Sequence, residues 1–197
     1  MLAKLRENLE GIPILSSAVI LDRYVPRTIA SDIALVGSGA LLIAISAQIQ
    51  IPMIPVPMTM QTFAVLLVAA ALGFSRGAAS TALYLALGAV GLPVFAGATA
   101  LKAAMPTIGY LIGFVAAAAL IGFLAERGFA KNPLKLAFAF VAGSTIVYAT
   151  GVMGLMVILD IDFQTAIQVG VVPFVIGDAL KAALAAAVLP IAWKFTK

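Results

Sequence analysis

The sequence predicts an all-α integral membrane protein in which six transmembrane helices form a compact bundle and two outer loops cover a ligand pocket. Of its 197 residues, 63% are hydrophobic and 10% are charged, whereas soluble domains contain about 45–50% and about 25%. Apolar runs of helical length recur along the chain, and two apolar loops rich in proline or glycine separate some of them. Because no long polar block interrupts this pattern, residues 28–197 are predicted to form one membrane domain.

Residues 1–27 are predicted to form an amphipathic segment at the cytoplasmic membrane interface. They carry seven charged side chains between short apolar groups. The apolar run that follows has no small-residue cleavage site after it and continues into further spans. We therefore expect the segment to remain in the mature protein rather than to act as a signal peptide.

The first predicted span covers residues 28–49. Prolines at positions 52, 55 and 57 follow it, and because proline is excluded from helix interiors, residues 48–59 are expected to be extended. Irregular backbone at membrane depth must be covered by protein or line a cavity, so this apolar loop is predicted to line a cavity. The next run, 61–72, is too short to cross about 30 Å of hydrocarbon and is expected to begin inside the protein.

The rest of the chain alternates between predicted spans and connections. In order these are a turn at 73–77, a span at 78–90, an apolar loop at 91–102, a span at 107–124, a polar connection at 126–135, a span at 136–159, a short polar link, and a span from Pro173 to about Trp193. The turn and the connections are recognised by their glycine, proline and charged residues.

Basic residues predict the orientation in the lipid bilayer. Six spans place both termini on one side, and that side collects ten of the twelve basic residues, whereas the opposite side has only Lys102. The positive-inside rule makes the basic side cytoplasmic. We therefore expect a multi-pass protein of the cell membrane with cytoplasmic N- and C-termini. The net charge of +4 is attributed to this orientation and not to nucleic-acid binding.

Two charges lie inside the last predicted span. Asp178 and Lys181 are three residues apart, which places them on one helix face, about 7 Å and about 12 Å below a helix start at Pro173. An intramembrane charge costs about 2.5–3.5 kcal/mol on insertion scales, so such charges are usually functional. The pair is either a structural ion pair or, as we favour, a binding site in which Asp178 accepts ligand N–H groups and Lys181 contacts a carboxylate or carbonyl oxygen.

Composition argues against several function classes. The chain has no cysteine and no histidine, which removes thiolate catalysis, the commonest metal ligand and the commonest general base. We therefore expect no enzyme activity, no metal and no cofactor. The Gly-x4-Gly-Lys-Ser/Thr phosphate loop of an autonomous ATP-driven pump is also missing from the sequence. A gradient-driven secondary transporter of a small carboxylate or vitamin stays open as the alternative, although no internal repeat is evident.

Aromatic and small residues supply further candidates. Phe95, in the second apolar loop, is a candidate for stacking on a ligand. Tyr84, Tyr110 and Tyr148 can line the pocket, anchor helices at the membrane interface or fill the core. On the first span small residues recur at three- and four-residue spacing and form a flat face for another helix, from the bundle or from a partner: Gly37, Ala40, Ala44 and Ala47.

An ordered series of motifs runs across residues 35–190. The motifs are Ile-Pro-Val-Pro-Met-Thr-Met-Gln-Thr at 54–62, Leu72-Gly73 with Arg76-Gly77-Ala78, Tyr-Leu-Ala-Leu-Gly at 84–88, Gly-Leu-Pro-Val-Phe-Ala-Gly at 91–97, Pro106-Thr107 with Gly109-Tyr110-Leu111 and Gly113-Phe114, and Gly177-Asp178 with Lys181. Taken together in this order, they resemble the biotin-specific substrate-capture (S) components of energy-coupling-factor (ECF) transporters, the BioY family.

The resemblance implies a six-helix subunit that binds biotin from outside and works with a transmembrane coupling subunit and a pair of cytoplasmic ATPases. It implies that Asp178 and Lys181 contact the vitamin, which offers two ureido N–H groups, a carbonyl, a thioether ring and a valerate carboxylate. It further implies that two outer loops close the pocket, here residues 57–61, with Thr59 and Gln61, and residues 93–97.

Two further details of the family carry over to this chain. The family docks onto its coupling subunit through an Ala-x-x-x-Ala pattern, which Ala40 and Ala44 match. Family members often have a polar residue such as asparagine in the second outer loop, where this chain has Ala96-Gly97-Ala98. Thr99 is then the nearest polar substitute.

Overall fold

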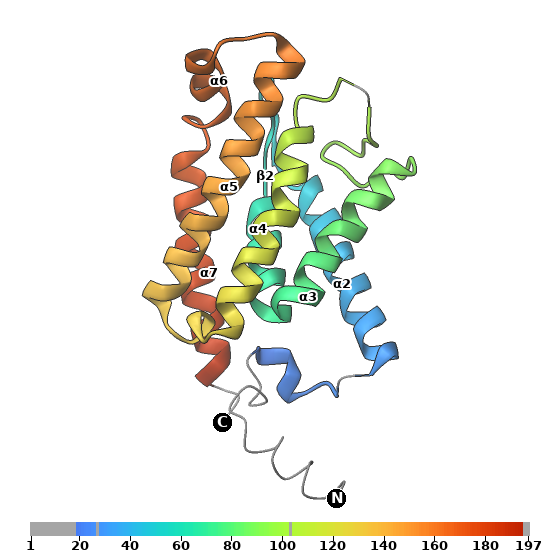
Figure 1. Ribbon diagram of the computed structural model, residues 1–197, viewed down its shortest axis with the longest axis vertical. Coiled ribbons are helices and arrows are strands. Elements are labelled where there is room, and N and C mark those ends of the chain that lie inside the picture. The colour runs from blue at the N-terminus through green and yellow to red at the C-terminus, as the bar shows by residue number, and fades with distance from the viewer. Residues whose placement is uncertain (1–18, 27, 103, 195–197) are drawn as a thin grey trace, which may run out of the picture.

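The computed structural model describes residues 19–26, 28–102 and 104–194 and is predominantly helical (Figure 1). Most of the predicted N-terminal segment, residues 1–18 and 27, lies outside the described residues. The elements are, in chain order, η2 (Ile20–Arg23), α2 (Ile29–Gln48), β1 (Gln50–Ile51), β2 (Met58–Thr59), α3 (Gln61–Ala89), α4 (Ile108–Glu126), η3 (Phe129–Lys131), α5 (Pro133–Leu159), α6 (Phe163–Gly170) and α7 (Val175–Lys194).

Local side-chain bonds define where several helices begin. Thr28 and Ser31 form a capping box, in which each side-chain oxygen accepts the other residue's backbone N–H, at 3.1 and 2.9 Å. The Asn132 side chain caps α5, and proline occupies that helix's first position. Asp162 caps α6 because Thr165 donates both its hydroxyl and its backbone N–H to the carboxylate. These bonds hold the pKa of Asp162 below its ordinary value.

The helix α3 reverses direction near its middle. Gly73 has φ 83° and ψ −171°, and a positive φ favours glycine because it lacks a Cβ. In Figure 1 the first arm descends from β2 and the second arm returns upward. The backbone N–H of Phe74 donates to Glu126 Oε1 at 2.8 Å, which ties the bend to the end of α4. The two predicted spans 61–72 and 78–90 are these two arms, and the predicted turn at 73–77 reduces to a break at one residue.

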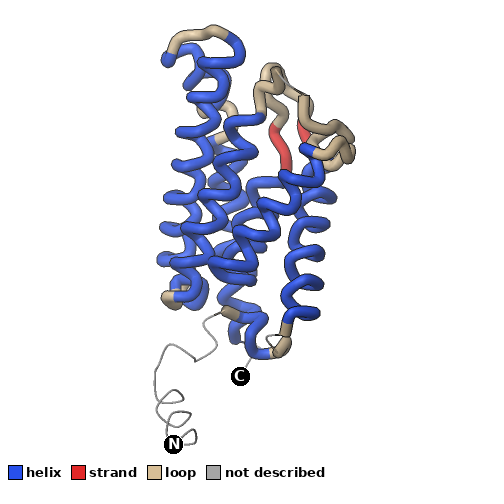
Figure 2. The backbone as a smooth tube through the Cα atoms, turned by 45° about the vertical axis from the view of Figure 1, so that its right-hand side comes forward, coloured by secondary structure: helices blue, strands red, loops and turns tan. Residues whose placement is uncertain are grey.

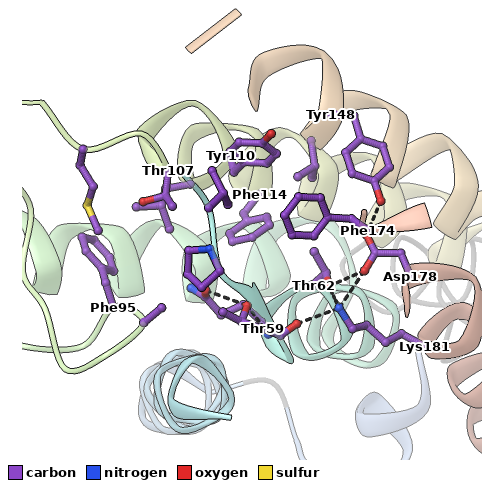
Figure 3. A pocket seen from close by; sticks show the side chains of 17 residues that line it. Thr59, Thr62, Phe95, Thr107, Tyr110, Phe114, Tyr148, Phe174, Asp178 and Lys181 are labelled. Carbon is purple, nitrogen blue, oxygen red and sulfur yellow. Dashed lines mark hydrogen bonds and ion pairs between the residues drawn. The ribbon is translucent and has the colours of Figure 1, made fainter. Parts of the chain in front are cut away.

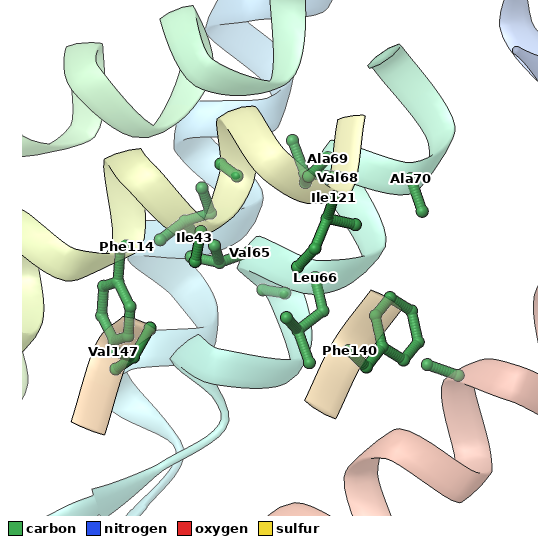
Figure 4. Close-up of a cluster of buried hydrophobic side chains, with 14 of the residues drawn as sticks. Ile43, Val65, Leu66, Val68, Ala69, Ala70, Phe114, Ile121, Phe140 and Val147 are labelled. Carbon is green, nitrogen blue, oxygen red and sulfur yellow. The ribbon is translucent and has the colours of Figure 1, made fainter. Parts of the chain in front are cut away.

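The core lies among α3, α4 and α5. Figure 4 shows side chains of the first arm of α3, such as Val65 and Leu66, packed with Ile121 of α4 and Phe140 of α5. The α4 and α5 backbones approach closely at Gly109, where a Cβ would overlap the Thr150 carbonyl oxygen. Such close packing fixes the relative position of the helices that carry the site.

Four helices, α2 to α5, are long and apolar enough to cross a membrane, and α6 with α7, bent by 50°, makes a fifth if the pair is one span. The chain is therefore an all-helical, multi-pass membrane protein. The described residues contain six α-helices, but not the six that were predicted. Two predicted spans share α3, and α6 stands where a polar link was expected, because the Asp162–Thr165 cap starts a helix there.

The two ends of the bundle differ in charge. At one end, called here the loop end, lie the β1–β2 hairpin, the loop after α3 and the α5–α6 link (Figures 1 and 2). At the other, the basic end, lie η2, the α3 bend, η3 and the end of α7. Among the described residues, most basic side chains lie at or near the basic end, including Arg127, Lys131 and Lys135, which is the asymmetry that the sequence predicts.

One basic residue at this end forms ionic hydrogen bonds inside the bundle. Arg76 is buried beside the bend, where its Nη1 donates to Asp22 Oδ1 at 2.8 Å and its Nε donates to Asp32 Oδ1 at 2.7 Å. These bonds join η2 and the start of α2 to the second arm of α3. The bundle is thus closed by an ionic contact at the basic end.

Candidate functional site

A cavity opens at the loop end, between the two loops and helices α3, α4, α5 and α7 (Figure 3). About 560 Å³ of space in and around it is free of protein atoms, and this value includes open solvent at its mouth. Its apolar wall consists of Val56, Pro57, Phe95, Ala96, Met105, Leu111, Phe114, Val147 and Phe174. Its polar residues are Thr59, Gln61, Thr62, Thr107, Tyr110, Tyr148, Asp178 and Lys181.

The ammonium group of Lys181 lies at one side of this cavity with all three of its N–H groups in use. It donates to Asp178 Oδ1 at 2.8 Å, to the Thr59 carbonyl oxygen at 2.8 Å and to Thr62 Oγ1 at 3.0 Å. A lysine has three donors and no acceptor. A ligand oxygen must therefore replace one of these partners in order to reach Lys181.

The carboxylate of Asp178 is in a different position. Its Oδ1 accepts from Lys181 and from Thr62 Oγ1, the latter at 3.2 Å, and its Oδ2 accepts from the Tyr148 hydroxyl at 2.6 Å. An ionised carboxylate offers about four acceptor sites, and these three bonds leave one. Asp178 can therefore accept a ligand N–H group without losing a present partner.

Burial makes this pair energetically important. The side chains of Asp178 and Lys181 are 12% and 10% exposed. Opposite charges at contact distance offset part of each other's desolvation cost, whereas a single buried charge has no such compensation. The cavity wall therefore presents a nearly neutral pair whose two members depend on each other.

Behind the cavity wall, a chain of contacts joins the two loops. Thr59 Oγ1 donates to Gln61 Oε1 at 2.9 Å, and Gln61 Nε2 donates to the Tyr84 hydroxyl. Tyr84 is fully buried and does not line the cavity. Its ring meets that of Phe95 edge-on, with centroids 5.3 Å apart and planes at 73°. Tyr84 thus supports two lining residues instead of facing the cavity itself.

Six of the seven predicted ligand-site residues share this one cavity: Asp178, Lys181, Phe95, Thr59, Gln61 and Tyr110. Tyr110 reaches it from α4 while its hydroxyl donates to the Gly170 carbonyl at 2.8 Å. Thr62 and Tyr148, which both bond to Asp178, were not predicted as ligand-site residues. Tyr148 was named only as a possible lining residue, and no spacing along the chain signals contacts that cross 116 and 30 residues.

The structure differs from what was expected for Thr99 and for the Ala40–Ala44 pattern. Thr99 is absent from the cavity wall, and its hydroxyl donates to the Ala96 carbonyl at 3.0 Å, so it does not supply a polar contact from the second loop. Ala40 is 2% exposed and packs inside the bundle, whereas Ala44 is partly exposed. In this conformation a partner helix can reach Ala44 but not the methyl group of Ala40.

Comparisons with known proteins agree with these features. The family model of the BioY family matches residues 16–197. The biotin transporter BioY of Thermotoga maritima is 46% identical over 154 residues, which are 74% of this chain and 85% of that protein. The probable biotin transporter BioY of Pyrococcus horikoshii is 36% identical over 158 residues, 79% and 92% of the two chains.

A solved structure is similar over nearly the same length. The crystal structure of the S-component for biotin from an ECF-type ABC transporter has a TM-score of 0.75 and 26% sequence identity, and the match covers 84% of this chain and 92% of that one. Sequence and fold therefore agree, and the chain belongs to the BioY family.

Proposed function

We propose that this protein is the membrane subunit that captures biotin for an ECF-type importer, and that biotin binds in the cavity at the loop end. The observation that carries the proposal is the Asp178–Lys181 pair in the wall of an otherwise largely apolar cavity, in a chain of the BioY family. Biotin has complementary chemistry, since polar groups flank an apolar thioether ring and alkyl chain.

The two charged residues have separate roles in this proposal. Asp178 accepts a ureido N–H group through its remaining acceptor site, while the Tyr148 hydroxyl holds the carboxylate in place. Lys181 exchanges Thr59 or Thr62 for an oxygen of the ligand, either the carboxylate or the ureido carbonyl. The apolar body of biotin contacts the aromatic wall formed by Phe95, Phe114 and Phe174.

The loops and the charge asymmetry support capture from the outer side of the membrane. In our proposal the loop end faces outward, both termini are cytoplasmic, and the hairpin and the loop after α3 act as lids. The basic connections at the opposite end support this orientation through the positive-inside rule. A thiol-reactive, membrane-impermeant label tests it, since the chain has no native cysteine. Ala98→Cys should be labelled in intact cells and Lys131→Cys only after lysis.

Energy must come from elsewhere, because the sequence contains no phosphate-binding loop of the Gly-x4-Gly-Lys-Ser/Thr type. We propose a transmembrane coupling subunit and a cytoplasmic ATPase pair as partners. The coupling subunit docks on the face of α2 that points away from the helix bundle. Ala44 is partly exposed there, and a Cβ on Gly37 would meet open space. Ala44→Leu should weaken co-purification with the coupling subunit and leave biotin affinity unchanged. Undiminished co-purification would refute docking at Ala44.

The ligand is tested by calorimetry on the purified protein in lipid nanodiscs. We expect biotin to bind with a Kd at about the nanomolar level, about −12 kcal/mol, and other water-soluble vitamins to bind at least a thousandfold more weakly. Tighter binding of another vitamin, or no binding of biotin, would refute the proposal. Accumulation of biotin in vesicles that contain this subunit alone, driven by an ion gradient, would favour the secondary transporter instead.

A further inference from the structure

We propose that Gln48 is a positioning residue that holds the loop after α3 closed over the cavity and so sets how fast the ligand leaves. The inference rests on the proposed function for its ligand. Its structural part, the restraint of the loop, can be tested without any ligand.

The side-chain amide of Gln48 bonds to the loop with both of its ends. Gln48 is the last residue of α2. Its Nε2 donates to the Phe95 carbonyl oxygen at 3.1 Å, and its Oε1 accepts the backbone N–H of Ala98 at 2.9 Å. The same Nε2 lies 3.4 Å from the Val94 carbonyl oxygen and 3.2 Å from that of Ala44, in its own helix. The amide group therefore bonds the loop at two separate points, the Phe95 carbonyl and the Ala98 N–H.

The segment that Gln48 holds is a tight turn bonded mainly to itself. Phe95 and Thr99 exchange backbone hydrogen bonds at 2.9 and 3.3 Å, and Gly97 and Ala98 close the turn with positive φ angles of 70° and 52°. Within residues 94–100, every hydrogen bond that the structure gives to another element comes from Gln48. Removing this side chain therefore leaves the turn intact but removes its hydrogen bonds to the bundle, so that the nearest remaining one is from the Leu101 N–H to the Gly88 carbonyl oxygen at 3.0 Å.

Detachment reaches the cavity through Phe95. This residue is 1% exposed, whereas Gly97 and Ala98, beside it, are exposed. Phe95 and Ala96 both line the cavity, and Figure 3 shows Phe95 on the side opposite Asp178 and Lys181. The Gln48 side chain thus holds one wall of the cavity and does not touch the wall that carries Asp178 and Lys181. Its loss should open the site while the contacts made by Asp178 stay unchanged.

The ligand-free test is hydrogen exchange on the protein in nanodiscs. In Gln48→Ala the amide of Ala98 loses its acceptor, and peptides that cover residues 91–102 should exchange about tenfold faster, as expected for the loss of two modest hydrogen bonds. Gln164→Ala is the matched control, because Gln164 is an exposed glutamine on α6. It should exchange like the wild type in this loop. Unchanged exchange in Gln48→Ala would overturn the proposal.

The functional test is the dissociation rate of biotin. In Gln48→Ala we expect release to be about tenfold faster, equivalent to about 1.4 kcal/mol, with little change in the association rate. Gln48→Glu keeps an acceptor for the Ala98 N–H, but it replaces the donor to the Phe95 carbonyl with a carboxylate oxygen. This variant should therefore also release biotin faster. Faster release of biotin without faster hydrogen exchange in the loop would overturn the proposal, because the loop would not have moved.

A cross-link distinguishes loss of the restraint by Gln48 from a general loss of protein stability. The chain has no native cysteine, so Gln48→Cys with Ala98→Cys can be joined by a short bifunctional thiol reagent. The double variant should release biotin fast before the reaction and slowly after it. Fast release after cross-linking would refute the proposal. If the wild type binds no biotin, the proposed function fails, and the exchange experiment still decides whether Gln48 restrains the loop.

Discussion

The substitution Asp178→Asn tests whether the buried pair binds the ligand or only stabilises the helix bundle. Asparagine has nearly the same shape as aspartate, but it loses the charge and replaces one acceptor oxygen with a donor. In the structure the Asp178 carboxylate accepts three hydrogen bonds, from Lys181, Thr62 and Tyr148. The change therefore leaves the Lys181 ammonium group buried without its counter-charge.

The two expected effects differ in size. Removing one member of a buried pair costs about 3–5 kcal/mol of folding stability, and these side chains are 12% and 10% exposed, so a value near the lower end is expected. Loss of one charge-assisted hydrogen bond to the ligand costs about 1.5–3 kcal/mol, or about tenfold to 150-fold in Kd. The variant should melt at a lower temperature and also bind biotin more weakly.

A double variant separates the two effects. Asp178→Asn with Lys181→Met removes the uncompensated charge and keeps most of the apolar stem of the lysine. If the pair binds the ligand, the double variant should regain much of the melting temperature and none of the affinity. Melting is measured by nanoscale fluorimetry, and affinity by calorimetry in nanodiscs.

The control is Asp162→Asn, another aspartate at the loop end. It caps α6 in full exposure, and asparagine caps helices about as well as aspartate, so both measurements should match the wild type. Wild-type affinity in Asp178→Asn, or in the double variant, would show that the pair is structural and that the ligand binds elsewhere.

Three further substitutions probe the surroundings of the pair. Gly88→Ala would place a Cβ only 2.1 Å from Cζ of the Phe95 ring, so the ring must move and biotin binding should weaken at least tenfold. Gly37→Ala, whose Cβ meets open space, should bind normally; equal affinities of the two variants in calorimetry would contradict this role of Phe95. Tyr148→Phe removes the hydrogen bond to Asp178 Oδ2 and should raise the Kd by about two- to tenfold, so an unchanged Kd would exclude Tyr148 from orienting the carboxylate. Gly109→Ala forces α4 away from the Thr150 carbonyl of α5 and should cost about 1–3 kcal/mol of stability, which a thermal melt of wild-type shape and midpoint would disprove.

Much of the architecture could be predicted because membrane helices follow from composition and from helix breakers. The bounds of α2, α4 and α5 agree with the predicted spans to within a few residues. The breaks at the prolines and at Gly73 also agree, since few residues other than glycine adopt a φ of 83°. The helix α6 was missed because eight residues with one capping aspartate resemble a polar link when read without their tertiary contacts.

The charged pair was predictable, but its partners were not. Helical spacing places Asp178 beside Lys181 whatever the fold. The bonds to Thr59, Thr62 and Tyr148 depend on the packing of α7 against β2, α3 and α5. Tyr84 was predicted as a ligand-site residue on its type alone, and type does not distinguish a residue in the cavity wall from one directly behind it. Contacts of this kind arise from the three-dimensional packing of distant segments, which periodicity does not encode.

The partners also change what the pair can do. The sequence predicts one ligand contact for each residue, N–H groups for Asp178 and a carboxylate or carbonyl oxygen for Lys181. In the structure Lys181 has no N–H group to spare, whereas Asp178 keeps one acceptor site. Binding at Lys181 is then an exchange of partners, and its net gain is the difference between two hydrogen bonds. The β1–β2 hairpin keeps its other bonds in such an exchange, because Thr59 pairs with Gln50 and its hydroxyl donates to Gln61 Oε1.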